Sequence, residues 1–254
     1  MKSLTGFKTL VWREIYRFLA VFRQTISPPL ISSFLYISIF GLSVGSLIHS
    51  VEGVSYVTYL VPGQIMACVI DGAYVNTSSS LFISRWANNI EELLVSPLSY
   101  FEMVLAVLIG GLARSLVVGT GVWAISLFFV QFPVEHPLIA LYFVIFVSLI
   151  FSSIGMMVAL YAEEFEHLSV AATFIIMPLT FFGGVFHSIN MMPEYLRWVA
   201  PINPIYYMIS GLRYGMLGFS DAPLVTSMLV VLILFLVLFT STVLLFKSGY
   251  KLRK

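Results

Sequence analysis

Long runs of uncharged, mostly apolar residues dominate this chain and limit the folds that it can adopt. Between Arg23 and Glu52 lie 28 residues without a charged side chain, and further runs of similar character follow. A transmembrane helix needs about 20 such residues. Because the runs do not alternate in polarity as the strands of a membrane barrel do, they indicate helices. We therefore predict an all-α polytopic membrane protein.

Composition excludes several other classes of protein. Only 10% of the 254 residues are charged, whereas ordinary soluble domains carry about 25%. A free cytosolic enzyme of this composition would expose large apolar patches. The formal net charge of +1 provides no basic surface for nucleic acid. The single Cys68 cannot form an intramolecular disulfide.

Six membrane-spanning helices are predicted from the spacing of the charges. They lie between residues 23 and 52, between 52 and 85, and over 113–130, 137–162, 168–186 and 222–246. The first apolar run begins only after Arg23 and is too long for the core of a signal peptide, so we expect a permanent helix there.

The Lys and Arg residues predict the orientation, because cytoplasmic loops carry an excess of them. With both termini in the cytoplasm, eleven of the 13 cations lie inside, and only Arg197 and Arg213 lie outside. This count includes Arg114 if the third span begins near it. Residues 103–112 would then form a helical extension at the cytoplasmic surface.

An amphipathic helix is predicted over residues 5–24, before the first span. Its apolar side chains share an arc of about 80° at 100° per residue, and they are Phe7, Val11, Ile15, Phe18 and Phe22. A basic helix with such a face is expected to lie in the cytoplasmic interface. It is either a simple anchor or a docking element for a partner.

The longest cytoplasmic connection covers residues 83–102. A short helix within it has an apolar side formed by Ile90, Leu93 and Leu94. The carboxylates Glu91 and Glu92 lie beside it. Ser96 and Pro97 end this helix, because a residue before proline disfavours the α conformation. The pattern suits insertion into a groove on another protein, and it is equally compatible with a surface helix packed on the bundle.

A second acidic segment follows the fourth span on the same side, with Glu163, Glu164 and Glu166. The neighbouring His167 makes a metal site conceivable. One histidine beside clustered carboxylates is a weak pattern for a metal, so a solvated turn is the preferred interpretation.

Residues 187–222 are predicted to form a broken segment on the outer side. Its prolines prevent one continuous helix, and it is too short to cross a membrane twice. Two short re-entrant helices fit, with their irregular backbone shielded by protein or facing a wet cavity. This predicted outer gate contains Pro193, Asn203, Pro204, Tyr206, Tyr207 and Arg213.

No catalytic constellation is expected in this chain. The four histidines, His49, His136, His167 and His187, are scattered and lack metal-ligand spacing, so no metal site is predicted. None of the five lysines follows a glycine, so the G-x-x-x-x-G-K-[ST] phosphate loop is missing. We therefore expect a chain that is not an enzyme and that carries no cofactor of its own.

Asp71 lies inside the second predicted span. An ionised Asp at mid-helix costs about 2.5–3.5 kcal/mol on the insertion scale. The seven Leu, Ile and Val residues of 57–80 return roughly 2–4 kcal/mol, which only balances that cost. This span must therefore be surrounded by protein or face a hydrated cavity. Asp71 is then a pathway-lining group, a proton acceptor, or a carboxylate bonded to a neighbouring helix.

Several motifs strengthen one another. The earlier ones are SPP at 27–29, VPG at 61–63, NIEELLVSP at 89–97 and GGLAR at 110–114. The more specific ones are FGGVF at 182–186, NPIYYMISG at 203–211 and RYG at 213–215. Together they resemble the ABC-2 type permeases, the membrane subunits of ABC exporters, and most closely the YadH-like inner-membrane group. The resemblance covers nearly the whole chain and implies one transmembrane domain over residues 1–254.

The resemblance implies two permease copies paired with two copies of a separate ATPase, which would bind ATP and Mg. Residues 90–97 would be the coupling helix in a groove of that ATPase, braced by the amphipathic helix and by the acidic loop at 163–167. The implied ATPase contacts are Ile90, Glu91, Glu92, Leu93, Leu94, Ser96, Pro97, Glu163, Glu164 and Glu166. The chain would lie in the bacterial inner membrane, contacting lipid but no nucleic acid.

An export pathway is predicted along the second and fifth spans. Its expected lining residues are Asp71, Asn76, Phe181, Phe182 and Phe186. The substrate would be an amphipathic, glycan-like or lipid-like molecule or a drug. Two alternatives remain: an ion-coupled carrier that uses Asp71, although we find no internal repeat of the kind such carriers show, and a membrane assembly subunit that transports nothing.

Overall fold

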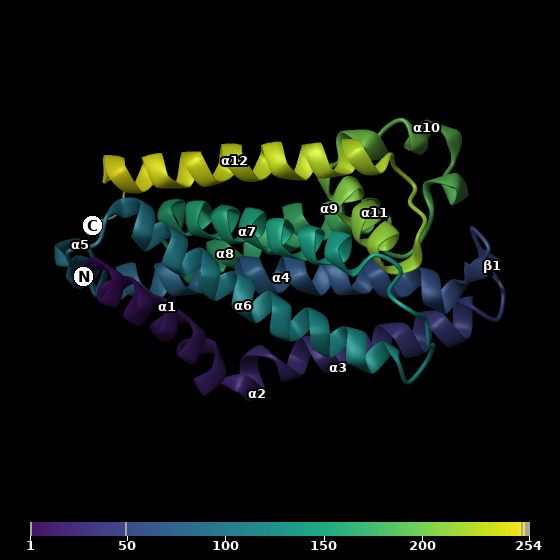
Figure 1. Ribbon diagram of the computed structural model, residues 1–254, viewed down its shortest axis with the longest axis horizontal. Coiled ribbons are helices and arrows are strands. Elements are labelled where there is room, and N and C mark those ends of the chain that lie inside the picture. The colour runs from purple at the N-terminus through teal and green to yellow at the C-terminus, as the bar shows by residue number, and fades with distance from the viewer. Residues whose placement is uncertain (1, 49, 250, 252–254) are drawn as a thin grey trace.

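Helices form almost all of the secondary structure in the computed structural model, which describes residues 2–48, 50–249 and 251. His49 and the predicted cytoplasmic cations Arg253 and Lys254 lie outside the described residues. The long helices run side by side (Figure 1). The beginning of α1, the short helix α5 and the end of α12 share one end of the bundle, and β1 and α10 share the other. We call these the α5 end and the α10 end.

Three helices form the N-terminal part: α1 (Lys2–Ala20), α2 (Phe22–Thr25) and α3 (Ser27–Ile39), which continues into the π-helical η1 (Phe40–Val44). Helix α1 occupies most of the predicted segment 5–24. Two prolines stand in the first turn of α3, where no intrahelical N–H is needed. Along α1 the buried side chains are Leu10, Glu14 and Phe18, one every four residues, so the packed face includes a carboxylate as well as apolar residues.

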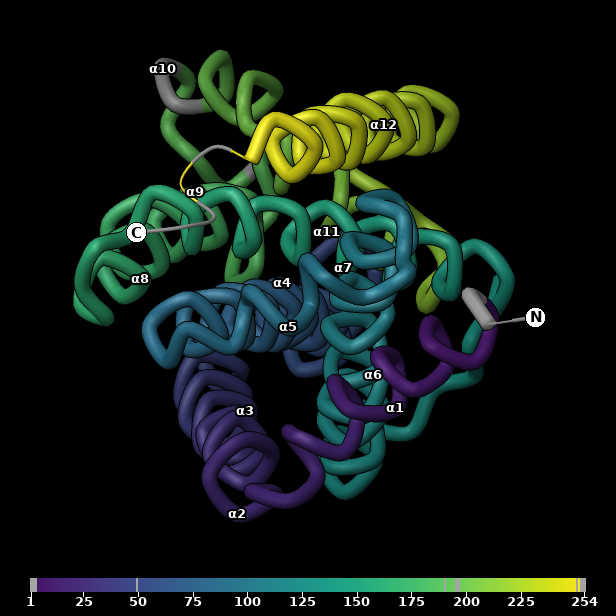
Figure 2. The backbone as a smooth tube through the Cα atoms, turned by 90° about the vertical axis from the view of Figure 1, so that its left-hand side faces the viewer, coloured from purple at the N-terminus to yellow at the C-terminus, as the bar shows by residue number. Residues whose placement is uncertain are grey.

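A small hairpin, β1 (Ser50–Val51) and β2 (Val54–Ser55), precedes α4 (Tyr56–Trp86). Glu52 and Gly53 form its turn with φ values of 52° and 84°, as a two-residue hairpin turn of the I′ type requires. Helix α4 has 31 residues, most of them buried. It contacts α3, α6, α7, α8 and α11, and the view along the bundle shows it at the centre (Figure 2).

Helix α5 (Ile90–Val95) is followed by α6 (Tyr100–Ser126). A reciprocal capping box begins α6: the Ser99 hydroxyl accepts from the backbone N–H of Glu102, whose carboxylate accepts from the N–H of Ser99. Helix α6 is continuous, and its residues 103–112 are largely buried in the bundle. The predicted helical extension over 103–112 is therefore part of α6, and its residues are apolar or glycine and pack against the core. Arg114 therefore lies in the middle of α6 and is 7% exposed.

The second half of the bundle consists of α7 (Pro137–Tyr161), a broken helix, and α12 (Leu224–Ser248). The broken helix runs from α8 (Phe165–Ala171) through the π-helical η2 (Ala172–Ile176) to α9 (Met177–Phe182). Between α9 and α12 lie short elements: η3 (Ile189–Met191), α10 (Glu194–Arg197), η4 (Ala200–Ile202) and α11 (Pro204–Leu217). These fall within the segment 187–222 that was predicted to be broken by its prolines.

Five helical segments of the described chain are long and apolar enough to cross a membrane: 22–44, 100–126, 137–161, 165–182 and 224–248. Each overlaps one of the six predicted spans. The remaining predicted span is α4, which is long enough but carries Gln64, Asp71 and Asn76. Its central, buried position explains how such a helix is accommodated, because its neighbours shield it from lipid.

Candidate functional site

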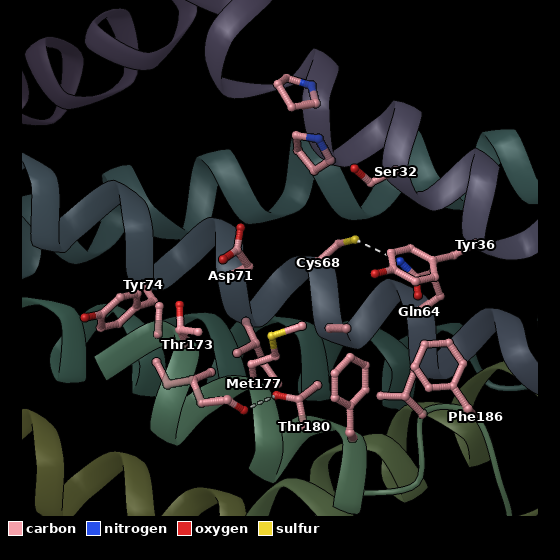
Figure 3. A pocket seen from close by; sticks show the side chains of 18 residues that line it. Ser32, Tyr36, Gln64, Cys68, Asp71, Tyr74, Thr173, Met177, Thr180 and Phe186 are labelled. Atoms are coloured by element: carbon pink, nitrogen blue, oxygen red, sulfur yellow. Dashed lines mark hydrogen bonds between the residues drawn. The ribbon is translucent and has the colours of Figure 1, made fainter. Parts of the chain in front are cut away.

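A groove of about 420 Å³ lies on one face of α4 (Figure 3). Helix α3 forms one wall, and η2 with α9 forms the other. The lining residues are Pro28, Pro29, Ser32, Tyr36, Gln64, Ala67, Cys68, Ile70, Asp71, Tyr74, Ala172, Thr173, Ile176, Met177, Thr180, Phe181, Val185 and Phe186. The floor is therefore polar in part, and the walls are apolar and aromatic.

The floor of the groove is a polar stripe along α4. Gln64, Cys68 and Asp71 follow one another at intervals of four and three residues, which places them on the same helix face. The Gln64 amide donates to the Ser33 hydroxyl of α3 at 3.1 Å, and that hydroxyl lies 3.1 Å from the Cys68 sulfur. These buried bonds join α3 to α4 beside the groove.

Asp71 is exposed in the groove and projects from α4 toward α3 (Figure 3). It takes part in no hydrogen bond or ion pair with the other residues that the structure describes. None of the described residues that line the groove is Lys, Arg or His. One turn further along α4, the Tyr74 hydroxyl donates to the Leu168 carbonyl at 2.8 Å, which closes this side of the groove against α8. The groove thus contains an unpaired carboxylate.

Three of the five predicted pathway residues, Asp71, Phe181 and Phe186, line the groove. Asn76 and Phe182 do not. Asn76 lies five residues after Asp71, which turns it about 140° around the helix, and it is fully buried on the side facing α1. The wall from α3 was not predicted, because a span with few polar residues has no sequence feature that separates its lipid-facing side from a lining side.

Aromatic rings close the groove toward the α10 end. The Phe186 ring lies 4.9 Å from that of Phe40, 5.4 Å from that of Phe181 and 6.0 Å from that of Tyr36, measured between centroids. The Tyr56 hydroxyl also donates to the Phe186 carbonyl at 3.0 Å. Phe186 therefore joins α3, α4 and α9 at the mouth of the groove.

A buried ion pair, Arg213 with Asp221, holds the α10 end together. The Arg213 side chain is 1% exposed, and its guanidinium also donates to the Gly184 carbonyl at 2.8 Å. The guanidinium carbon lies 3.8 Å from the centroid of the Tyr59 ring, a cation–π contact. Asp221 accepts from the Tyr59 hydroxyl at 3.2 Å and from the Ser188 hydroxyl at 3.1 Å. This network joins α4, α11 and the loop that carries Phe186.

The other predicted gate residues have structural contacts at the same end. Asn203 caps α11 by accepting from the Ile205 N–H at 3.0 Å, and it donates to the Leu179 carbonyl at 2.6 Å. Pro204 occupies the first turn of α11, and the Tyr206 hydroxyl donates to the Asp221 carbonyl at 2.7 Å. The remaining two lie nearby: Tyr207 packs against Tyr206, and Pro193 accepts from the Arg197 N–H.

His187 lies beside this network. In the sequence it is one of four scattered histidines, and nothing there indicated this position. Burial lowers its pKa, and the positive charge of Arg213 lowers it further, whereas Asp221 opposes the shift. Burial and the Arg213 charge thus favour the neutral form of the imidazole.

A second polar cluster lies toward the α5 end, where α1 crosses α4 and α6. The Glu14 side chain is 1% exposed, accepts from the Ser80 hydroxyl at 2.6 Å and pairs with Arg17 at 3.5 Å. Arg17 donates to both the carbonyl and the side-chain oxygen of Asn76, at 2.7 and 3.1 Å. Burial lowers the pKa of Arg17, and the charge of Glu14 counteracts this. A Cβ atom at Gly110 would lie 2.6 Å from that of Glu14, so α1 approaches α6 closely.

We expect replacement of Glu14 by alanine to loosen α1 from the bundle. The change leaves Arg17 without its carboxylate, and because about a third of the Arg17 side chain is exposed, the expected loss is about 2 kcal/mol, below the 3–5 kcal/mol of a fully buried pair. Thermal unfolding in detergent and limited proteolysis within α1 measure this. The exposed Glu91→Ala is the matched control. Equal behaviour of the two variants would contradict the assignment.

The α5 end contains the residues predicted to contact an ATPase. Ile90 is buried, and Leu93 and Leu94 are half-buried, all against the bundle's own apolar core. The outward-facing residues are Glu91, Glu92, Val95 and Pro97, and Ser96 is half-buried. The apolar stripe thus anchors α5 to its own chain, and the opposite face is available to a partner.

The acidic loop lies at the same end. Glu163, Glu164 and Glu166 are exposed, and Glu163 pairs with Lys251 at 3.6 Å. His167 accepts from the Glu163 N–H through Nδ1 at 3.2 Å, as in an ordinary turn. Arg85 donates to the Ala162 carbonyl at 3.2 Å and thereby fixes this loop to the end of α4.

Comparison with known proteins identifies the family of this chain. The sequence profile of the ABC-2 type transporter family matches residues 5–217, which run from the first turn of α1 to the end of α11. The chain belongs to the ABC-2 type transporter family. This confirms the resemblance found in the motifs.

Relatives within this family include the inner membrane transport permease YadH of Escherichia coli K12, which is 43% identical over 230 residues, or 90% of each chain. Nodulation protein J of Rhizobium meliloti is 27% identical over 210 residues, or 82% of this chain and 78% of that protein. The similarity to YadH confirms the predicted YadH-like character of this ABC-2 protein.

Proposed function

We propose that this ABC-2 protein is the membrane-spanning permease subunit of an ABC exporter in the bacterial inner membrane. The observation that carries the proposal is the groove on α4, closed at the α10 end by Phe186 and flanked by two largely exposed helices. Family membership and the name of the YadH relative, an inner membrane transport permease, support the same function. The chain itself would be neither an enzyme nor the site of a cofactor.

Six spans with both termini in the cytoplasm fit this arrangement, with α4 as the shielded sixth helix. The beginning of α1 and the end of α12 lie at the same end of the bundle (Figure 1). With Arg114 assigned to the middle of α6, ten cations remain on the proposed inner side, against Arg197 and Arg213. The α5 end would then be cytoplasmic, and α10 with α11 would form the re-entrant outer segment.

A second copy of this chain would cover the groove. The helices on either side of it expose large apolar side chains, namely Ile31, Leu35 and Ile39 on α3 and Phe174, Ile175 and Met177 on η2 and α9. Pairing of these surfaces around a twofold axis would place two grooves face to face. The homodimer would thereby enclose one pathway between the two chains.

Two copies of an ATPase subunit would supply the energy, binding ATP and Mg at their own phosphate loops. The outward face of α5, with Glu91, Glu92 and Val95, would be the coupling helix that rests on the ATPase, and the loop at 163–166 would brace it. When ATP closes the ATPase dimer, α5 moves with it and the helix packing changes. The substrate would leave beneath the 187–222 segment once Phe186 separates from Phe40 and Tyr36.

Replacing Glu91 by lysine together with Val95 by aspartate is expected to abolish ATP-driven transport. The ATPase would cover the exposed Val95 side chain. Loss of that apolar contact and reversal of the neighbouring charge would each weaken the interface by about 1–3 kcal/mol, so binding of the ATPase should fall about 100-fold or more. Co-purification with the ATPase and transport into inside-out vesicles measure the two effects.

The matched control is Leu47→Asp with Glu135→Lys. Leu47 and Val95 are both 82% exposed, Glu135 is exposed, and neither Leu47 nor Glu135 lies on α5 or in the 187–222 segment. Full transport by the α5 variant would contradict the coupling-helix assignment. Absence of any ATP-dependent transport by the unmodified complex would contradict the exporter function. Transport that follows a pH gradient without ATP would favour the ion-coupled alternative, and association without transport would favour an assembly subunit.

A further inference from the structure

We infer that the groove selects a hydrophobic organic cation, so that the transported molecule is a cationic amphipath rather than an anionic lipid or glycan carrier. This inference rests on the proposed transport function and names its substrate class. The inference rests on the negative charge that one side chain, Asp71, provides in the groove.

The groove carries a negative charge that none of the described lining residues balances. Among the described residues that line the groove, Asp71 provides the single carboxylate, and no basic side chain is present to neutralise it. Arg114, whose charge acts on Asp71 from α6, does not line the groove and donates instead to the Thr25 carbonyl at 3.1 Å. In an apolar setting an unpaired carboxylate is costly, and a bound cation offsets that cost directly.

The walls suit the rest of such a molecule. Tyr36, Phe181 and Phe186 present aromatic rings, and Met177 adds a flexible thioether. Aromatic faces attract organic cations, and methionine adapts to irregular apolar shapes. A volume of about 420 Å³ lies in the range of pockets for drug-sized ligands. The groove therefore combines one negative charge with an apolar chamber.

The same lining disfavours anionic substrates. Phosphate and pyrophosphate groups are normally bound by Arg, Lys or clusters of backbone N–H groups. The described lining residues include neither Arg nor Lys, and the Thr180 hydroxyl already donates to the Ile176 carbonyl at 2.7 Å. A phosphorylated lipid carrier would bring its charge next to Asp71, where like charges repel.

Two ions of the same shape and opposite charge test the inference: tetraphenylphosphonium and tetraphenylborate. The purified full-length chain in nanodiscs is titrated with each by equilibrium dialysis. We expect the phosphonium to bind at least 10-fold more tightly than the borate. Asp71→Asn should weaken phosphonium binding at least 10-fold, because a tenfold change corresponds to the loss of one modest charge contact. Asp71→Glu keeps the charge and should retain binding within about threefold.

Glu135→Gln, which neutralises an exposed carboxylate just before α7, is the matched control and should leave binding unchanged. The thermal midpoint of each variant establishes that it is folded. No phosphonium binding, equal or tighter binding of the borate, or unchanged binding by Asp71→Asn would each overturn the inference. The assay needs no ATPase, so its failure is distinguishable from failure of the exporter function, which the α5 variants test.

Discussion

Replacing Asp221 by alanine is expected to lower the free energy of unfolding by about 3–5 kcal/mol, because it leaves the buried Arg213 without its carboxylate. Arg213 is 1% exposed, so water cannot take the place of the lost partner. The Tyr59 and Ser188 hydroxyls would also lose their hydrogen bonds to Asp221. For a chain of this length the thermal midpoint should fall by about 10 °C.

The double variant Arg213→Met with Asp221→Leu provides the control for this result. Removing both charges avoids a buried unpaired group, so most of the lost stability should return. Thermal unfolding of the two single variants and the double variant forms a complete cycle. A loss below about 1 kcal/mol for Asp221→Ala would show that the pair does not hold the α10 end together.

Replacing Gly155 by alanine is expected to prevent normal packing of α7 on α4. A Cβ atom at this position would lie 2.4 Å from the Thr77 hydroxyl oxygen and 2.7 Å from the Tyr74 carbonyl oxygen. The second contact is with backbone, which cannot rotate away. Because the two helices form the centre of the bundle, overpacking here should cost about 3 kcal/mol or more, and folded protein recovered from membranes should fall sharply.

Gly72→Ala is the matched control, since its Cβ would meet nothing nearer than 3.7 Å, at Ser115. This change replaces glycine within α4 and should be tolerated or slightly stabilising, because alanine favours helix by about 1 kcal/mol. Size-exclusion profiles and thermal midpoints of both variants provide the comparison. Equal stability of the two variants would mean that α7 is not packed against α4 as the structure shows.

Sequence reasoning located the helices well, because their signals are local. The prolines at 28–29 and 204 begin α3 and α11, and Ser96 with Pro97 ends α5. It missed the capping box at the start of α6, although the S-x-x-E pattern of residues 99–102 is visible in the sequence. Because this start was missed, the third span was placed at 113–130 with a helical extension over 103–112, whereas the helix begins at Tyr100.

The polar clusters were harder to anticipate. Asp71 was recognised as unusual because it interrupts an apolar span, whereas Glu14 lay among basic residues and was not distinguished from a solvated side chain. Asp221 follows Arg213 by eight residues in a segment with few charges. That spacing was the one available signal for their pairing.

The sequence alone determined that this chain is a bundle of apolar helices of the ABC-2 type, because helix length, apolar runs and family motifs are properties of short segments. Only the tertiary structure decided which charged side chains pair and which face of α4 lines the groove. Glu14 and Ser80 are 66 residues apart, and Tyr59 and Asp221 are 162 apart. Such pairs depend on how whole helices rotate and cross, and that is set by the packing of glycine and side-chain surfaces against one another.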